Sequence, residues 1–233
     1  GGMWAPLAWG VSDLKVVRVS DERRLRELYA FRYRVYVDEL GWLQPCSPAS
    51  QPASQPASQR CGANVEALVS GLLTDCFDAV ALNYAACDDD GAIVGSMRVV
   101  PDGPIGLPLE ECWPLDGFRS GKRVAELCRL AVTPKRRLTR LPLLLMKAGW
   151  QGARRLGVSH VLVDAYVDNE QRTHAVYKKL GFSPLGGTYV DSRYRRSDPS
   201  VVMAIECDAG EEALPPHLRN YFRSADPLID HGD

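Results

Sequence analysis

The chain has 233 residues, of which 45% are hydrophobic and 24% are charged, and its formal net charge is −1. This length allows one large domain with its own core, and the composition is that of an ordinary soluble globular protein. A net charge near zero argues against a general nucleic-acid-binding protein, and no apolar run approaches the roughly 20 residues of a membrane-spanning helix.

We expect a cytoplasmic protein. No basic region precedes an apolar one near the N-terminus, so no signal peptide is expected. The seven cysteines have no close spacing, which suits reduced thiols and predicts neither a zinc site nor a redox pair.

The first part of the chain predicts a strand, a helix and an insertion. Residues 14–19 suit a strand, and Asp21 can cap a helix whose apolar residues recur at helical spacing as far as Tyr36. Residues 45–60 repeat Pro-Ala-Ser-Gln and contain nothing able to anchor a core, so we expect a mobile insertion there. A short helix over 64–73 would return the chain to the domain.

The middle of the chain predicts a hairpin. Residues 79–87 and 92–100 suit two strands, and the turn between them, 88–91, is rich in Asp and ends in Gly. Its acids are most simply a solvated tip, so no metal site is expected. Residues 101–121 contain several Pro and Gly and form a long connection.

The second half alternates strands with helices. The expected strands are 124–132, 158–166, 182–190 and 200–206, and the expected helices are 141–156 and 168–180. The pattern predicts an α/β (α+β) fold: one domain over 14–206, with a central mixed, mainly antiparallel twisted sheet flanked by helices, and a C-terminal extension over 207–233.

The apolar strand Val124–Val132 contains one acid, Glu126, and one base, Arg129. Charges in a buried strand are costly unless paired, so these two form either a structural ion pair or part of a site. Residues three apart on a regular strand point to opposite faces. If Glu126 and Arg129 share one cleft, we therefore expect a β-bulge that turns one of them over.

Five segments resemble motifs of one superfamily, in the same order along the chain. They are Arg32-Tyr-Arg-Val-Tyr36 with Leu40-Gly-Trp42, the acidic pair Asp75 and Asp78, Arg98 in Gly-Ser-Met-Arg, Glu126 with Arg129, and Asn169 with Tyr177-Lys-Lys-Leu-Gly-Phe182. The last segment resembles the closing motif of the GCN5-related N-acetyltransferases, although its spacing is slightly longer. The others resemble the acyl-homoserine-lactone synthases of the same superfamily, which make quorum-sensing autoinducers.

Two departures favour the related long-chain N-acyl amino acid synthases over the lactone synthases. Leu73 stands where lactone synthases usually have a Glu, and the C-terminal half is more similar to ordinary acetyltransferases and N-acyl amino acid synthases. The resemblance implies an N-acyltransferase that moves a fatty acyl chain from a thioester to the α-amine of an amino acid. The alternatives are a lactone synthase that uses S-adenosylmethionine and a non-catalytic acyl-binding module on the same scaffold.

The donor is expected at the segment that follows the central strand. Residues 136–141 lack the Gly-rich loop with which acyl-CoA enzymes of the superfamily commonly hold pyrophosphate, although a helix start still offers backbone donors. The resemblance implies acyl carrier protein, with the chain on a phosphopantetheine thioester, as the donor; CoA is the alternative. No permanently bound cofactor is expected. The expected donor-binding residues are Lys135, Arg136, Arg137, Arg140, Asn169 and Tyr177; a solvated basic helix start is the structural alternative for the four basic ones.

In the implied reaction, an amine loses a proton and attacks a thioester. Glu126 is the candidate base because burial raises a carboxyl pKa, whereas a nearby Arg129 lowers it. The alternative is that Glu126 binds the ammonium while water takes the proton. We expect a backbone N–H freed at a bulge or splay to stabilise the thioester oxygen. We also expect no acyl-enzyme at Cys128, since no Cys-His-Asn motif is visible.

By resemblance, a charge network surrounds the cleft and binds the amine acceptor. Its expected members are Arg32, Asp75, Asp78, Arg98 and Arg129, with Trp42 as a cover. The same residues suit a structural role that holds the first helix onto the sheet. The apolar residues Leu141, Leu144 and Leu145 and strand 161–163 line an acyl tunnel if they are not simply core.

Overall fold

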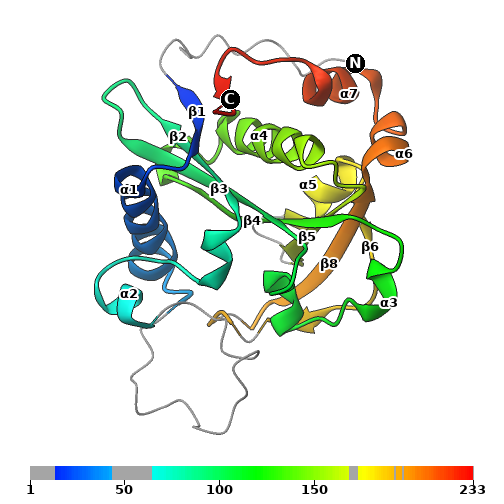
Figure 1. The fold of residues 1–233 in the computed structure, drawn as a ribbon, viewed down its shortest axis with the longest axis horizontal. Coiled ribbons are helices and arrows are strands. Elements are labelled where there is room, and N and C mark those ends of the chain that lie inside the picture. The colour runs from blue at the N-terminus through cyan, green and yellow to red at the C-terminus, as the bar shows by residue number, and fades with distance from the viewer. Residues whose placement is uncertain (1–13, 44–64, 168–172, 192, 196, 233) are drawn as a thin grey trace, which may run out of the picture.

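The computed structural model describes residues 14–43, 65–167, 173–191, 193–195 and 197–232, which form one mixed sheet with helices packed against it (Figure 1). The insertion expected at 45–60 and the site residue Asn169 lie outside the described residues.

The strands are β1 (Lys15–Val19), β2 (Leu82–Cys87), β3 (Ile93–Pro101), β4 (Val124–Val132), β5 (His160–Tyr166), β6 (Ser183–Pro184), β7 (Tyr189–Val190), β8 (Pro199–Glu206) and β9 (Ile229–Asp230). The helices are α1 (Glu22–Tyr33), α2 (Val65–Val69), α3 (Asp116–Arg119), α4 (Leu141–Arg155), α5 (Thr173–Lys179), α6 (Cys207–Glu212) and α7 (Pro216–Arg223). A π-helical segment, Arg34–Glu39, continues α1, and short 3-10 segments lie at Cys76–Ala79, Pro108–Glu111 and Pro134–Arg136.

The described strands lie in the order β6-β8-β5-β4-β3-β2-β1-β9, with β7 also paired to β8. Strand β4 is parallel to β5 and β1 is parallel to β9, whereas the other described pairs are antiparallel. Parallel neighbours need a long crossover, and α4 supplies it between β4 and β5. The mixed, mainly antiparallel sheet predicted from the sequence is confirmed.

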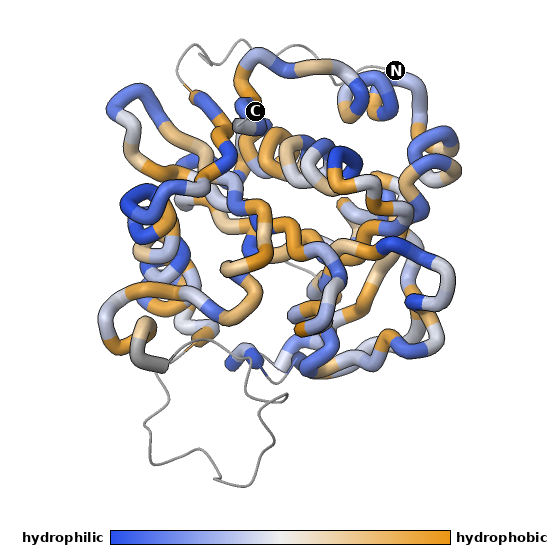
Figure 2. Tube along the Cα trace, viewed as in Figure 1, coloured by the Kyte–Doolittle hydropathy of each residue, from blue (hydrophilic) through white to orange (hydrophobic). Residues whose placement is uncertain are grey.

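Helices α4 and α1 pack on opposite faces of the sheet. Neighbouring residues of β2 show this, because Ala86 belongs to the apolar cluster that contains Leu145 of α4, whereas Ala85 belongs to the cluster that contains Leu28 of α1. Figure 2 shows how hydrophobic segments concentrate on the central strands. Each face of the sheet therefore has its own apolar layer.

The face that carries α1 holds a second apolar cluster, formed around Leu109, Val124 and Leu162. Its strand residues alternate with Ala125 and Val161, which belong to the α4 face. The α1 face is thus covered by two apolar clusters, one under α1 and one under the loop that contains Leu109. The polar side chains described below lie on this same face.

Two strand boundaries differ from the prediction. Strand β2 begins at Leu82, because Asp75 caps the 3-10 segment that occupies the expected start. The strand expected over 182–190 is reduced to β6 and β7. Between these two strands Gly186 passes so close to Trp113 that an added Cβ would lie 2.8 Å from the indole, so the chain leaves the regular strand path there.

The C-terminal segment packs onto the sheet. Leu214 and Phe222 are buried in the α4-side core, and β9 pairs with the edge strand β1. Lys147 of α4 is buried and bonds Asp226 at 3.2 Å. These contacts hold α6, α7 and β9 against α4.

Among the cysteines that the structure describes, one departs from the expectation of reduced thiols. Cys87, Cys112, Cys128 and Cys207 are free, but Cys76 is disulfide-bonded.

Candidate active site

Strand β4 contains the predicted bulge. Ser96 of β3 pairs with Ala131, but Arg98, two residues later, pairs with Cys128, so β4 has one residue more than β3 in this interval. Arg129 lies in that interval with a φ of 54°, in the left-handed region that non-glycine residues rarely adopt. The strand therefore bulges at the position that the charge spacing predicted.

The bulge places the charges of β4 on one face of the sheet. Cys128 belongs to the apolar cluster under the loop and Leu127 to the α4-side cluster, so Glu126 and Cys128 face the loop. Arg129, which would point to the other face on a regular strand, reaches Asp75 on the α1 face. Glu126 and Arg129 nevertheless form no ion pair with each other, because each has its own partner.

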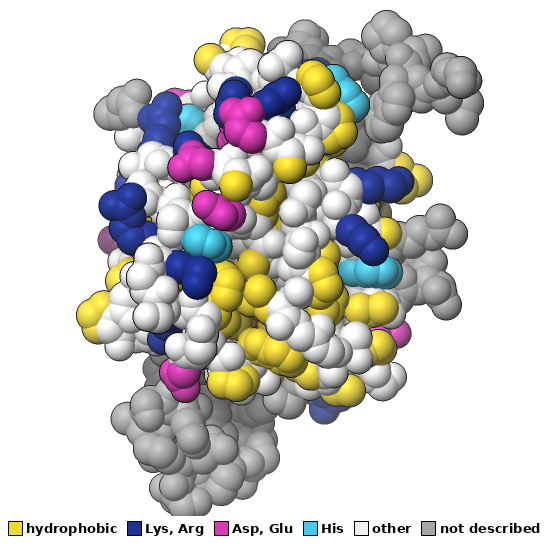
Figure 3. Space-filling view, turned by 90° about the vertical axis from the view of Figure 1, so that its right-hand side faces the viewer, with side chains coloured by type: hydrophobic (Ala, Val, Ile, Leu, Met, Phe, Trp, Pro, Cys, Tyr) yellow, Lys and Arg dark blue, Asp and Glu magenta, His cyan; other side chains and the backbone are white. Residues whose placement is uncertain are grey.

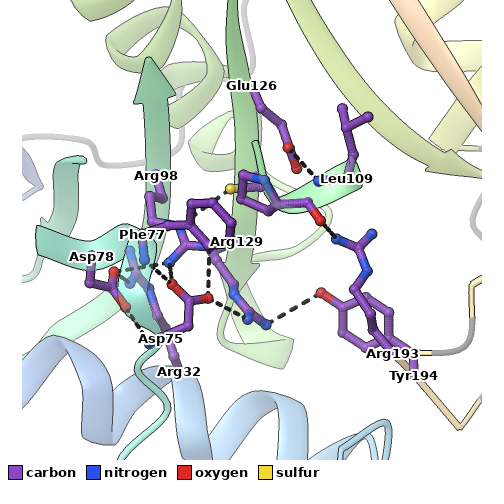
Figure 4. A network of polar contacts seen from close by, with 12 residues as sticks. Arg32, Asp75, Phe77, Asp78, Arg98, Leu109, Glu126, Arg129, Arg193 and Tyr194 are labelled. Atoms are coloured by element: carbon purple, nitrogen blue, oxygen red, sulfur yellow. Dashed lines mark hydrogen bonds and ion pairs between the residues drawn. The ribbon is translucent and has the colours of Figure 1, made fainter. Parts of the chain in front are cut away.

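Arg98 and Arg129 converge on the carboxylate of Asp75 (Figure 4). Arg98 donates to both carboxylate oxygens, at 2.6 and 3.0 Å, and Arg129 donates to one of them at 3.0 Å. Although burial opposes it, these two guanidinium groups hold the pKa of Asp75 well below its usual range. Asp75 therefore stays ionised at the centre of the network.

Arg32 joins α1 to the same network. It is fully buried and donates to Asp78 at 2.9 Å, Asn83 at 2.6 Å and Ser96 at 2.8 Å. Asp78 in turn lies 3.1 Å from Arg98. The predicted set of Arg32, Asp75, Asp78, Arg98 and Arg129 is thus brought together.

The network holds three guanidinium groups and two carboxylates, so the charges do not cancel. Arg32 and Arg98 are at most 1% exposed, whereas the side chain of Arg129 retains 11% exposure. Arg129 is therefore the cation of this network that solvent or a small anion reaches most readily.

Glu126 is buried, and its hydrogen-bond partner is a backbone N–H, not an arginine. Its Oε2 accepts the backbone N–H of Leu109 at 2.9 Å. Burial raises the pKa of Glu126 to about 7, against the lowering effects of Arg193, of the Leu109 N–H and then of Arg98 and Arg129. A carboxyl with this pKa exchanges a proton near neutral pH, which suits a general base.

Arg193 orders the loop that holds Glu126. It donates to the carbonyl of Pro108 at 2.7 Å, next to Leu109, and to Asp164 at 3.2 Å. Its remaining contacts, at 2.6 to 3.1 Å, go to both carboxylate oxygens of the buried Asp191. Arg193 thereby positions the loop and supplies the strongest charge effect on Glu126.

Cys128 accepts a hydrogen bond from Nε of Arg98 at 3.3 Å. Burial raises the pKa of the Cys128 thiol, although Arg98 opposes the rise. A neutral thiol is a poor nucleophile, which argues against a covalent acyl-enzyme at this residue.

Aromatic side chains border the network. Trp42 packs edge-on against Tyr36 at 5.8 Å, Tyr166 at 5.4 Å and Tyr194 at 6.2 Å between ring centroids. Tyr194 also accepts a hydrogen bond from Arg129 at 3.3 Å. Trp42 thus packs against two tyrosines that contact Arg129, and its role as a cover stays a prediction.

The four basic residues expected to bind the acyl donor lie just before α4. Lys135 and Arg140 are exposed, and Arg136 is partly exposed. Arg137 differs, because it donates to the carbonyl of Val132 at 3.0 Å and pairs with Glu39. The side chain of Arg137 therefore serves to anchor the segment.

Tyr177 is buried in the α4-side core and packs against Phe182 at 5.4 Å between ring centroids. Burial raises its pKa, and the charges of Asp164 and Cys128 add to that effect. Tyr177 is therefore part of the α4-side core, and its role in donor binding stays a prediction.

The apolar residues expected to line an acyl tunnel are close-packed core. Leu141, Leu144, Leu145 and the strand 161–163 are all buried. A small cavity on the α4 face is lined by a different set: Leu127, Met146, Trp150, Leu180, Phe182, Ile205, Leu214 and Phe222. Its volume of about 10 Å³ holds about one water molecule, so a fatty acyl chain fits there only if side chains move.

The structure adds residues that sequence reasoning missed. They are Asn83, Ser96, Leu109, Asp164, Asp191, Arg193 and Tyr194. Asp164 had a usable signal, since it is a lone acid in an apolar strand, as Glu126 is. Among the described residues, no group of three or more His, Cys, Asp or Glu side chains could hold a metal ion.

On the face that Figure 3 shows, Lys and Arg side chains are scattered and form no continuous basic surface among the described residues. No described helix has the length and apolar character to cross a membrane.

Comparison with known proteins identifies one matching family. A family model for the N-acyl amino acid synthase FeeM matches residues 27–206. The comparison with curated proteins gives no match.

Solved structures share the fold. The N-acyl amino acid synthase FeeM from uncultured soil microbes is 14% identical with a TM-score of 0.63, over 86% of this chain and 94% of that chain. The CoA-dependent acyl-homoserine lactone synthase BjaI, with SAM and isopentyl-CoA, is 16% identical with a TM-score of 0.63, over 94% and 93%. A candidate N-acetyltransferase from Lactobacillus plantarum is 13% identical with a TM-score of 0.52, over 83% and 98%.

These low identities show an acetyltransferase-like α/β fold. The family model covers well over half of the chain, so this protein is an N-acyltransferase and belongs to the FeeM family of N-acyl amino acid synthases.

Proposed function

We propose that this enzyme transfers a fatty acyl chain from an acyl-carrier-protein thioester to the α-amine of an amino acid, giving an N-acyl amino acid. The observation that carries the proposal is Glu126, a buried carboxyl with a pKa of about 7, on a bulged strand beside a cationic network. The non-catalytic alternative has no support from a family of synthases. We retain the cytoplasmic location expected from the sequence.

In the proposed reaction, the acceptor amine gives a proton to the Glu126 carboxylate, directly or through water. The amine nitrogen then attacks the thioester carbon, the tetrahedral intermediate collapses, and the carrier thiol leaves with a proton. No step uses Cys128, whose half-buried thiol is hydrogen-bonded to Arg98. The attack is therefore direct.

The separation of β4 from β5 supports a position for the thioester oxygen between these strands. Their pairing ends at Leu127 with Val163, although β4 runs on to Val132 and β5 to Tyr166. Main-chain groups of β4 beyond Leu127 thus lack a β5 partner in the sheet. We propose that a backbone N–H of this part of β4 stabilises the oxyanion, an interaction typically worth about 3 kcal/mol.

The acceptor carboxylate is best matched by Arg129. The guanidinium groups of Arg32 and Arg98 donate hydrogen bonds to several protein side chains. Arg129 is the most exposed of the three arginines. The surplus positive charge of the network also favours an anion there. Arg129 and Glu126 lie on the same face of the sheet, which supports an α-amino acid as the acceptor.

The carrier protein is proposed to dock at the start of α4. Lys135 and Arg140 are exposed there, and Leu138 between them is fully exposed. A cationic surface with a protruding apolar side chain suits an acidic partner protein. BjaI is described as CoA-dependent, so both donors belong in the test.

Charge reversal at this surface should discriminate between donors. With Lys135→Glu and Arg140→Glu combined, KM for an acyl carrier protein donor should rise roughly tenfold or more, because electrostatic steering is lost. KM for an uncharged acyl-pantetheine should stay unchanged. In the control Arg23→Glu, on the exposed surface of α1, KM should stay unchanged for both donors. An equal rise for both donors would contradict carrier docking at this surface.

Substitutions of Arg193 should change the pKa of Glu126, the proposed base. Arg193 lowers the pKa of Glu126, so Arg193→Ala should move the midpoint of the pH–kcat/KM profile upward from about 7. Arg193→Lys keeps the charge, so its midpoint should stay near 7 even if the rate falls. The exposed Arg195→Ala serves as the control. A midpoint that is the same in wild type and Arg193→Ala would show that Glu126 is not the titrating group.

The reaction itself is tested by thiol release. Carrier-protein and CoA thioesters of different chain lengths are mixed with single amino acids or with S-adenosylmethionine, and products are identified by mass spectrometry. An amide with a free amino acid supports the proposal, and a lactone from S-adenosylmethionine supports the lactone synthase alternative. If no thioester turns over with any acceptor, the proposal fails.

A further inference from the structure

A surface cavity lies between the second half of α4 and the ends of α6 and α7, three helices that Figure 1 shows side by side. Its volume is about 400 Å³, which is the size of a pocket for a small organic molecule. It shares no residue with the charge network, with Glu126 or with the basic segment before α4. From Arg140 to Arg154 the axis of α4 rises by roughly 20 Å, so the proposed reaction does not use this cavity.

The cavity has an apolar side and a basic side. Trp150 of α4 and Phe222 of α7 line the apolar side, and their rings pack edge-on with centroids 6.2 Å apart. Three exposed arginines line the basic side: Arg154, Arg155 and Arg223. A ligand that fits both sides combines an apolar ring with a polar head group.

The hydrogen-bond acceptors of the cavity already have partners. Glu211 accepts from Nε of Arg223 with Oε1 and from Nε1 of Trp150 with Oε2, the second bond at 3.0 Å. Oε1 of Gln151 accepts from Nε2 of His231 at 3.1 Å, and Nε2 of Gln151 donates to two main-chain carbonyls. Each side-chain acceptor atom among the described residues that line the cavity is therefore in use.

Hydrogen-bond donors, in contrast, remain for a ligand. Arg154 gives one terminal nitrogen to Asp208 at 2.6 Å, and the side chain of Asp208 is 81% exposed. Arg223 gives Nε to Glu211 and one terminal nitrogen to Glu212. A guanidinium group carries five N–H donors, so both arginines keep donors that no protein group occupies. The cavity is thus rich in donors and poor in acceptors.

This inventory selects a head group with several acceptor oxygens. Four guanidinium groups and three carboxylates lie in or next to the cavity: Arg154, Arg155, Arg219 and Arg223 with Asp208, Glu211 and Glu212. The C-terminal ends of α4 and α7 carry partial negative charge that offsets this small surplus, so net charge decides little. The hydrogen bonds decide, because a phosphate or carboxylate accepts several N–H groups of a guanidinium fork at once.

We propose that this cavity is a binding site for a small organic anion. Its phosphate or carboxylate accepts hydrogen bonds from Arg154 and Arg223, and its apolar ring packs against Trp150. Such a ligand contacts α4 and α7 together, so its binding stabilises the C-terminal segment against α4. Binding there is independent of acyl transfer.

Calorimetric titration of the full chain, without donor or acceptor, tests the site with probes that share one aromatic ring. The anions are phenyl phosphate and phenylacetate, the uncharged member is benzyl alcohol, the cation is benzylamine, and inorganic phosphate is the head group alone. One of the two anions should bind roughly tenfold or more tightly than benzyl alcohol and than inorganic phosphate. The comparison of phenyl phosphate with phenylacetate shows which head group the site prefers.

Substitutions locate the binding. Arg154→Gln combined with Arg155→Gln should weaken binding of the preferred anion roughly tenfold or more, because two guanidinium groups of the cavity are lost. Arg23→Gln combined with Arg26→Gln, on exposed positions of α1, removes the same charge and should leave the affinity unchanged. The anion should also raise the thermal unfolding midpoint of the wild type but not that of the Arg154 and Arg155 variant.

Several results would overturn the site. An equal loss of affinity in both double variants would indicate general charge attraction, and unchanged affinity in the Arg154 and Arg155 variant would place the anion elsewhere. Equal affinity for benzyl alcohol or for inorganic phosphate would also contradict it. If the variant does not fold, a crystal structure of the wild type with phenyl phosphate decides. Density in the cavity supports the site, whereas density only at Arg129 or before α4, or none, counts against it.

Discussion

Glu126→Gln should lower kcat/KM by about 10²- to 10⁴-fold while leaving the protein folded. The amide has nearly the shape of the carboxyl, and its oxygen can still accept the Leu109 N–H, but it cannot take a proton. In the wild type, log kcat/KM should rise with pH and level off above about 7, because only the ionised carboxylate is a base and its pKa is about 7. Steady-state rates from pH 5.5 to 9 measure both effects.

The same substitution gives a stability control. The folded-state pKa of Glu126 lies above its ordinary value, so its contribution to stability is fully present at low pH and is lost as the pH rises through about 7. Glu126→Gln should therefore be no less stable than the wild type above pH 7 in urea unfolding. Glu206→Gln, at the exposed end of β8, is the matched surface control and should keep full activity. Near-normal activity in Glu126→Gln would leave Glu126 with a binding role at most.

Asp75→Asn should lower the free energy of unfolding by about 3–5 kcal/mol at pH 7. The substitution leaves Arg98 and Arg129 buried or nearly so without the carboxylate that both contact. It also replaces the cap of the 3-10 segment at Cys76–Ala79. Urea unfolding at pH 7 measures the loss, with Asp90→Asn in the exposed β2–β3 turn as the control.

The ion pairs of Asp75 also predict how the folding stability of the wild type depends on pH. The pKa of Asp75 is depressed in the folded state, so its contribution to stability is present above the unfolded-state pKa of about 4 and is lost as the pH falls further. The stability difference between wild type and Asp75→Asn should therefore be constant from pH 5 to 8 and should shrink in acid. A difference below about 1 kcal/mol at pH 7 would mean that the network contributes little to the fold.

The sequence was most informative where a charge interrupts an apolar strand. Glu126 and Arg129, three residues apart, implied a bulge if they shared a face, and the structure has that bulge with Arg129 at a positive φ. The alternation of strands and helices likewise predicted the mixed sheet. Both are local patterns, and burial imposes them directly on the residues concerned.

Contacts between distant segments were not predictable in the same way. Arg193 lies 67 positions after Glu126 and acts on it through a loop carbonyl, a backbone N–H and its charge. Nothing in the local sequence of a polar segment shows which buried carboxyl its arginine will meet. The sequence left open whether Leu141, Leu144 and Leu145 line an acyl tunnel or fill the core for a related reason, since an apolar stripe has the same sequence pattern in both cases.

The bulge in β4 makes the length of this strand as important as its composition. The strand is fixed on both sides of the bulge, by pairing of Ala125 with Val161 and of Val132 with Gly95. Deleting Leu130 would restore continuous pairing with β3 and turn Arg129 toward the α4 core. This single-codon deletion should therefore inactivate the enzyme, although every acid and every arginine of the site is still encoded.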